Sequence, residues 1–229
     1  MRYAVMLGTI GFALLAVGAV CPVGGWFWMW AGVSFGSAAL GYAGLGSRVF
    51  GKGPGGRIPL VLKVLNFPYL AYTGCVWHLV RLLSREAAFN TIDDDLVIGR
   101  RLLAGEAPEG FDHYVDLTAE FEDPASIRVR PGYHCLPILD ASVPNVDDLM
   151  GAVERSANGR AFVHCAQGHG RTGLFALALL LRRGRVQTIE EGVGLLRSLR
   201  PAVRLNRRQE DFARRYLASY CERKEFPCP

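Results

Sequence analysis

The chain has 229 residues, of which 50% are hydrophobic and 21% are charged, and its formal net charge is +5. Its mean hydropathy of +0.17 is high for a water-soluble protein, and the apolar residues are concentrated near the N-terminus. The six cysteines form no Cys-x-x-Cys pair and no His/Cys cluster with zinc-ligand spacing, which excludes a zinc-binding module.

Two uncharged stretches open the chain. Residues 3–20 and 26–47 flank a short turn, and each is near the length of about 20 residues that crosses a bilayer. Tryptophans beside the turn suit a membrane interface, and a Gly-xxx-Gly pair formed by Gly32 and Gly36 would let two helices approach closely. We therefore expect a two-helix transmembrane hairpin within residues 1–50.

Two other interpretations of this region are a cleaved signal peptide and a buried soluble hairpin. A signal peptide does not explain a second uncharged span, and Val20 before the first cysteine fits a lipoprotein signal poorly. The flanking charges are Arg2 on one side and Arg48, Lys52 and Arg57 on the other, with no acidic residue among them. The positive-inside rule then predicts that both ends of the hairpin, and the domain that follows, are cytoplasmic.

Residues 51–89 are expected to connect the hairpin to that domain. A breaker-rich linker at residues 51–56 precedes an apolar segment at residues 58–83, which polar residues and Pro68 interrupt. The interruptions favour a helix that lies in the membrane interface. A helix packed on the following domain and a third membrane crossing are the alternatives.

From residue 90 on, short apolar runs alternate with helical patterns. This alternation predicts an α/β fold with a mostly parallel central sheet flanked by helices. The run of three aspartates at residues 93–95 lacks the rest of a calcium loop, so it indicates a solvated turn. Strands are expected within residues 91–99, 113–117, 128–138 and 160–163, and helices from residue 145, at residues 174–181 and 188–199, and at the C-terminus.

Asp140 lies on a loop between a predicted strand and the helix that Asn145 is expected to cap. Asp147 and Asp148 fit the first turn of that helix, where acidic side chains are favourable. A carboxylic acid on a mobile loop can donate a proton to a leaving group, and Asp140 is the candidate for that role. Two earlier carboxylates, Asp112 and Asp116, precede the loop and fit the role less well.

The strongest functional motif is the stretch 164–173, His-Cys-Ala-Gln-Gly-His-Gly-Arg-Thr-Gly. It joins a predicted strand to a predicted helix, so its backbone N–H groups and the helix N-terminus can surround a phosphate. Gly168 and Gly170 permit the tight turn. Arg171 can close this cradle with paired hydrogen bonds, and Cys165 at its floor is favoured as a thiolate. A buried structural cysteine in a glycine-rich turn would explain neither Arg171 nor His164.

This stretch resembles the His-Cys-(five residues)-Arg-Thr/Ser signature of the cysteine-dependent protein phosphatases, most closely their dual-specificity branch, which includes lipid phosphatases. Residues 91–99 are similar to the opening strand of that branch, and residues 200–209 are similar to its Arg-Pro loop and the start of the next helix. The resemblance implies a dual-specificity-phosphatase-like catalytic domain at residues 90–229. It also implies hydrolysis of phosphomonoesters through a phosphocysteine intermediate, with no metal or other cofactor.

The family's pattern implies a role for each matching residue. Cys165 would be the nucleophile and Arg171 the phosphate-binding side chain. Asp140 would be the general acid, because the family's acid lies on such a loop upstream of the cysteine. The phosphate oxygens would be bound by Ala166, Gln167, Gly168, His169, Gly170 and Arg171.

Three further residues would support the chemistry. Thr172 would donate a hydrogen bond that eases departure of the thiolate, and His164 would shape the loop. Gln209 matches a glutamine that orients the hydrolytic water in several branches. A surface glutamine in the first turn of a helix is an equally good explanation of Gln209.

Together with the expected membrane segments, the resemblance implies a membrane-anchored protein phosphatase with dual specificity for Tyr and Ser/Thr. One alternative is a lipid phosphatase that acts on a phosphorylated headgroup at the bilayer, which the membrane segments favour. Gln167 favours the protein phosphatase, since lipid-directed members often carry lysine there. An inactive phosphate-binding module is a third possibility, against which the intact Cys165, Arg171 and Asp140 argue.

The basic residues bear on the partners of the protein. No nucleic-acid motif accompanies them, so we expect no nucleic-acid partner. Anionic headgroups of the bilayer or a phosphorylated substrate are the simpler partners, and a solvated basic face without a partner is the alternative. The residues concerned are Arg182, Arg183, Arg185, Arg204, Arg207 and Arg208.

Overall fold

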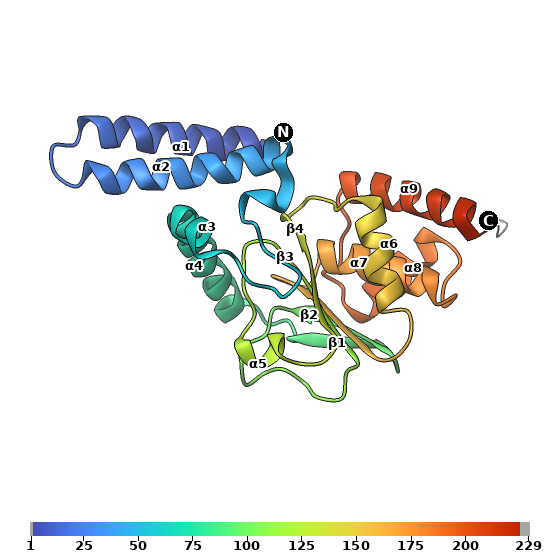
Figure 1. Cartoon of the computed structure of the whole chain (residues 1–229). Coiled ribbons are helices and arrows are strands. Elements are labelled where there is room, and N and C mark those ends of the chain that lie inside the picture. Colours follow the sequence, from blue (N-terminus) through green and yellow to red (C-terminus); the bar gives the residue numbers. More distant parts are fainter. Residues whose placement is uncertain (1, 225–229) are drawn as a thin grey trace. The chain divides into compact units, whose positions relative to one another are not determined.

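The computed structural model describes residues 2–224, which form two compact units (Figure 1). The first unit contains the chain up to Gly53, together with Arg57–Arg85 and Ala119–Glu122. The second contains Pro54–Gly56, Glu86–Thr118 and the chain from Asp123 onward.

The first unit begins with a helical hairpin. Helices α1 (Arg2–Val20) and α2 (Gly25–Leu40) lie side by side, joined by a short turn (Figure 1). A Cβ atom on Gly11 would lie 2.9 Å from the carbonyl oxygen of Gly32, which is closer than a Cβ atom normally approaches another atom. The two backbones therefore touch through glycine, as the small residues in this region predicted.

The expectation of two membrane-crossing helices is wrong. Among the described helices, only α1 is long and apolar enough to cross a bilayer, with a mean hydropathy of 2.1. The 16 residues of α2 span about 24 Å at ~1.5 Å per residue, less than the ~30 Å hydrocarbon core. A π-helical turn η1 (Gly41–Leu45) and a 3-10 turn η2 (Gly46–Val49) follow, with Gly44 at φ 156°. The uncharged run continues past Leu40, but its glycines end the regular helix.

The apolar segment at residues 58–83 forms two helices, α3 (Leu60–Leu65) and α4 (Phe67–Leu83). They are separated at Asn66, a buried residue whose side-chain amide donates hydrogen bonds to the carbonyls of Val49 and Leu62. By length and composition, neither helix qualifies as a membrane span. Large apolar side chains of α4 are nevertheless exposed, among them Phe67, Tyr72, Leu79, Leu82 and Leu83.

The second unit is built on a five-stranded sheet in the order β1-β2-β5-β3-β4. Strand β1 is antiparallel to β2, and the other neighbouring pairs are parallel. The predicted α/β fold with a mostly parallel sheet is thus confirmed. The strands are β1 (Phe89–Asp93), β2 (Leu96–Arg100), β3 (His113–Thr118), β4 (Tyr133–Ile138) and β5 (Ala161–Cys165).

Helices α6 (Val146–Arg155), α7 (Gly170–Arg182), α8 (Ile189–Leu199) and α9 (Arg207–Lys224) lie on one side of the sheet (Figure 1). They share the larger core with alternate residues of β5, including Val163 and Cys165. The intervening residue Phe162 belongs to a second cluster on the opposite face, which also contains Ile127 of the short helix α5 (Ala125–Arg128). This alternation points the side chain of Cys165 toward the helices and that of His164 to the other face.

Candidate active site

The loop from β5 to α7 turns tightly around the sulfur of Cys165. Gly168 has φ +74°, and a Cβ atom there would lie 2.4 Å from the carbonyl carbon of Gly99. Only glycine fits this position without distortion. The backbone N–H of Gly168 donates a hydrogen bond to Cys165 Sγ at 3.2 Å, and α7 begins two residues later at Gly170.

The environment of Cys165 favours its thiolate form. The residue is 3% exposed, and this burial by itself raises the pKa of the thiol. The positive charge of Arg171 and hydrogen bonding by the side chain and backbone of Thr172 outweigh burial and the opposing charge of Asp140, so the pKa of Cys165 is lowered. A buried thiol with a lowered pKa has the character of a nucleophile.

Arg171 and Asp140 meet beside this sulfur. Arg171 is 1% exposed, donates a hydrogen bond from Nη1 to the Ile138 carbonyl at 2.8 Å, and places Nη2 3.2 Å from Asp140 Oδ1. The Asp140 side chain is 69% exposed. Strands β4 and β5 are both parallel to β3, so their carboxyl ends, which precede Asp140 and the loop, lie at the same edge of the sheet. The structure thus brings together the three residues that the sequence singled out for catalysis.

The competing carboxylates lie elsewhere. Asp147 and Asp148 occupy the first turn of α6, where the Asn145 side chain accepts a hydrogen bond from the Asp147 N–H. Asp112 accepts a hydrogen bond from the Arg160 N–H, at the start of β5 rather than its end. Asp116 is completely buried within the sheet.

Gln209 is not a surface residue, so that interpretation of it is wrong. It is 1% exposed, and its Nε2 donates a hydrogen bond to the Ser142 carbonyl at 3.2 Å. A Cβ atom on Gly170 would lie 2.9 Å from Gln209 Oε1. Gln209 therefore lies between the loop that follows Asp140 and the start of α7.

The sequence motifs assign no role to Asn206, yet its side chain is hydrogen-bonded to the loop after Asp140. Its Nδ2 donates a hydrogen bond to the carbonyl of Ala141 at 3.0 Å. Ala141 has φ 53°, a strained conformation for a residue other than glycine. No local sequence pattern predicts this contact, because Asn206 and Ala141 are 65 positions apart.

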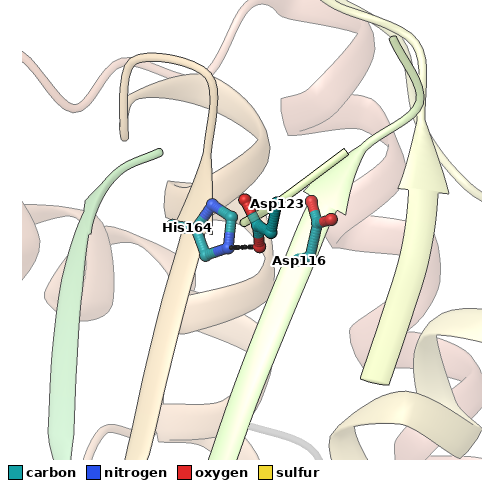
Figure 2. Close-up of side chains that lie close together, drawn as sticks. All are labelled: Asp116, Asp123 and His164. Atoms are coloured by element: carbon teal, nitrogen blue, oxygen red, sulfur yellow. Dashed lines mark hydrogen bonds and ion pairs between the residues drawn. The ribbon is translucent and has the colours of Figure 1, made fainter. Parts of the chain in front are cut away.

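His164 takes part in a buried polar network behind the loop (Figure 2). Its ring points toward Asp123 in the segment after β3, with Nε2 2.9 Å from Asp123 Oδ2. Asp116 lies beside this pair because it is opposite His164 in the register of β3 and β5. This contact fits the expected role of His164 in shaping the loop.

A metal ion is the other candidate for this network, because the ligand atoms of Asp116, Asp123 and His164 all lie within 4.8 Å of one another. Protein donors already occupy the carboxylate of Asp116. Its Oδ1 accepts hydrogen bonds from the N–H and hydroxyl of Thr118, and its Oδ2 accepts one from the Tyr133 hydroxyl. We therefore interpret the cluster as a hydrogen-bond network.

His169 lies at the outer side of the loop. Its Nε2 is 2.8 Å from Glu86 Oε2, and both side chains are partly exposed. The carbonyl of Ala166 accepts a hydrogen bond from the backbone N–H of Arg101. All residues expected to bind phosphate thus lie in one loop and the first turn of α7.

The sequence matches no protein-family model and no curated protein. Solved structures are similar in fold. A structure of PTPMT1 in complex with PI(5)P has a TM-score of 0.53 and 15% identity, and the match covers 60% of this chain and 99% of that one. Human DUSP28 has a TM-score of 0.52 and 17% identity over 59% of this chain and 96% of its own.

A third similar structure is that of the human tyrosine phosphatase-like serine/threonine/tyrosine-interacting protein. Its TM-score is 0.50, with 19% identity over 58% of this chain and 97% of that chain. The chain therefore contains the fold of the dual-specificity and PTPMT1-like cysteine phosphatases. At these identities the likeness shows the fold alone.

Proposed function

We propose that the protein is a cysteine-dependent phosphomonoesterase of the dual-specificity type, acting on phosphorylated protein side chains. The observation that carries the proposal is the buried Cys165, whose pKa is lowered beside Arg171 and Asp140. A buried cysteine with only a structural role has no need of an adjacent buried arginine.

In the first step, the thiolate of Cys165 attacks phosphorus and the bond from phosphorus to the ester oxygen breaks. Asp140, as a carboxylic acid, gives its proton to the departing oxygen, which leaves as an alcohol or phenol. Arg171 and the N–H groups of the loop hold the three remaining phosphoryl oxygens and stabilise their charge. The ion pair between Arg171 and Asp140 would weaken when the guanidinium binds the phosphate.

In the second step, water attacks phosphorus and the bond from phosphorus to sulfur breaks. The carboxylate of Asp140 accepts a proton from the water, and inorganic phosphate is released. Hydrogen bonds from Thr172 and the Gly168 N–H would stabilise the departing thiolate. Gln209 is close enough to the start of α7 to orient the water, which would require it to release one of its backbone partners.

A lipid phosphatase is the second candidate function. The apolar helix α1 and the exposed apolar side chains of the first unit favour a substrate at the bilayer. One structural neighbour was solved with a phosphoinositide. The protein phosphatase and the lipid phosphatase would use the same chemistry at Cys165, so they differ only in the substrate that can enter the site.

We further propose that α1 anchors the protein in the cell membrane. Three cations follow the hairpin at Arg48, Lys52 and Arg57, whereas only Arg2 precedes it. The positive-inside rule then favours a cytoplasmic location for the chain that follows α1.

The experiment that tests the function compares phosphate release from phosphopeptides and from phosphatidyl phosphates in mixed micelles, using wild type and Cys165→Ser. We expect release from phosphotyrosine and phosphothreonine peptides by wild type and none by Cys165→Ser. Release from the lipids alone would make the lipid phosphatase the function. Equal release by wild type and Cys165→Ser would contradict both candidates.

A further inference from the structure

Arg200 is a buried cation to which the sequence assigned no role. It is 2% exposed and lies at the C-terminal end of α8, directly before Pro201. Burying a guanidinium without hydrogen-bond partners is costly, so the partners of Arg200 indicate its structural role.

Two of these bonds go to the loop around Cys165. Arg200 Nε donates to the Gly168 carbonyl at 3.0 Å, and Nη2 donates to the Gln167 carbonyl at 3.1 Å. One guanidinium therefore holds two consecutive carbonyl groups in the middle of the loop.

The carbonyl and N–H groups of a trans peptide point in opposite directions. Fixing the Gln167 carbonyl on Arg200 therefore directs the Gly168 N–H away from Arg200. This N–H donates to Cys165 Sγ. By the same geometry, the bond to the Gly168 carbonyl directs the His169 N–H away from Arg200.

The other side of the guanidinium is bound to the segment before and within β1. Nη1 donates to the Ala87 carbonyl at 3.0 Å and to Asn90 Oδ1 at 2.7 Å. Nη2 also lies 3.5 Å from Glu86 Oε2. Arg200 thus joins the loop to the edge of the sheet, so the loop carbonyls are held against a fixed element.

Electrostatics agree with this placement. Burial lowers the pKa of Arg200, while the charges of Glu86 and Cys165 act in the opposite direction. Arginine stays protonated in proteins even so. Its positive charge therefore lies near enough to Cys165 to favour the thiolate.

We propose that Arg200 is the positioning residue of the phosphate cradle, which turns the loop N–H groups toward the sulfur by binding the carbonyls of Gln167 and Gly168 from behind. The inference rests on the proposed phosphatase function, and it adds a residue that does not touch the substrate. Lysine cannot replace this arginine, since its single ammonium group lacks the planar set of N–H donors that binds the loop and the β1 segment at the same time.

The test uses the full-length chain in detergent micelles and two readouts that need no turnover. The first is the pH dependence of alkylation of Cys165 by iodoacetamide, followed by peptide mass spectrometry. The second is protection of Cys165 from alkylation by tungstate, an oxyanion of phosphate-like shape. The variants are Arg200→Lys and Asn90→Ala, which removes one acceptor of Arg200 without burying a new charge.

Arg183→Lys is the matched control. Arg183 also donates to backbone carbonyls, those of Asp95, Ser156, Ala157 and Gly159, but near the other end of α7. Its loss should lower the melting temperature and leave the alkylation pKa and the tungstate affinity unchanged.

We expect Arg200→Lys to raise the pKa of Cys165 and to weaken tungstate binding roughly ten- to hundredfold, the range of one or two charge-assisted hydrogen bonds. Asn90→Ala should act in the same direction with a smaller effect. A lower melting temperature with both readouts unchanged would make Arg200 merely structural and overturn the proposal. If Arg200→Lys does not fold, unchanged readouts in Asn90→Ala overturn it.

The proposed function can fail separately. Wild type that neither hydrolyses phosphate esters nor binds tungstate would refute the phosphatase itself. Wild type that does both, beside an Arg200→Lys variant with unchanged readouts, would refute only the role of Arg200.

Discussion

Burial raises the pKa of the Cys165 thiol, whereas the charge of Arg171, together with hydrogen bonding by Thr172, lowers it and outweighs burial. Without that charge, the same buried position would favour the neutral thiol. The thiolate state of Cys165 therefore depends on a residue six positions away in sequence, which the turn of the loop brings close to the sulfur.

Removal of the Arg171 charge should therefore raise the pKa of Cys165. In wild type, the pKa lies below the 9.0 of an unperturbed thiol, so the thiolate forms as pH rises through this lower value. In Arg171→Met, burial remains and the main opposing charge is gone, so the midpoint should move to higher pH. Alkylation of Cys165 as a function of pH measures both midpoints. An unchanged midpoint would show that another group stabilises the thiolate.

Substitution of Asp140 by asparagine should separate substrates by their leaving groups. A general acid contributes about 10²–10⁴-fold where the departing oxygen needs a proton. Asp140→Asn should therefore lose about that much kcat/KM, which reports departure of the leaving group, on alkyl phosphates and far less on p-nitrophenyl phosphate. Asp147→Asn, in the first turn of α6, is the control and should leave both rates near wild type. Equal losses on both substrates would remove Asp140 from the acid role.

Cys165, Arg171 and Asp140 could be found from sequence because the first two share a local motif and the third lies on a loop of the expected kind. The residues that hold them could not. Arg200 binds Ala87, which is 113 positions away, and His164 pairs with Asp123 across 41 positions. For Gln209, only the fold shows that the side chain is buried beside the start of α7.

At the scale of elements, the strand, loop and helix around the motif form a unit that requires glycine at one point. Gly168 combines φ +74° with backbone contact to Gly99 of β2. Strand β2 and the loop after β5 are therefore in close backbone contact without any bound substrate. The conformation of the loop is part of the fold.

Gly168→Ala should damage both stability and phosphate binding. An added Cβ is strained at this positive φ and would lie 2.4 Å from the Gly99 carbonyl carbon, so backbone must move. Gly184→Ala is the control, because Gly184 has φ +64° but no heavy atom within 4 Å of its Cβ position. We expect Gly184→Ala to cost about 1 kcal/mol from φ strain alone, and Gly168→Ala to cost more and to abolish protection by tungstate. Equal unfolding free energies for the two variants would contradict the close contact.

Helices that depend on local signals were predicted well, and those that depend on glycine placement were not. Asn145 and Thr188 accept N–H hydrogen bonds at the starts of α6 and α8, as their sequences indicated. The absence of charge in the second apolar span predicts one long helix, which the structure does not have. Gly41, Gly44 and Gly46 divide it into three short pieces.

At the scale of the whole molecule, alternating strands and helices predicted the α/β class but not the order of strands. Strand β5 lies between β2 and β3 although about 40 residues separate it from the nearer of them. Parallel neighbours come from distant segments, so sequence periodicity alone does not pair them. The central position of β5 places the Cys165 loop at the middle of the sheet edge.

Membrane attachment is a property of the whole chain that α1 should determine. We expect wild type to remain in the membrane fraction after alkaline carbonate extraction. Phe12 and Val17 are exposed on α1, and Phe12 lies near its middle, where an arginine costs about 2.5–3.5 kcal/mol on insertion scales. The double substitution Phe12→Arg and Val17→Arg should therefore release the protein, whereas Phe12→Ala with Val17→Ala should not. Release of wild type itself would show that α1 is no anchor.

The most direct test of the account is to trap the phosphoryl group on the protein. Asp140→Asn should accept phosphate from p-nitrophenyl phosphate, whose leaving group needs no proton, but should hydrolyse the intermediate slowly. After quenching in detergent, mass spectrometry should find the phosphoryl group on the peptide that contains Cys165, and it should be absent when Cys165→Ser is added. Turnover with Cys165 unmodified, or with the phosphoryl group on another residue, would contradict the mechanism.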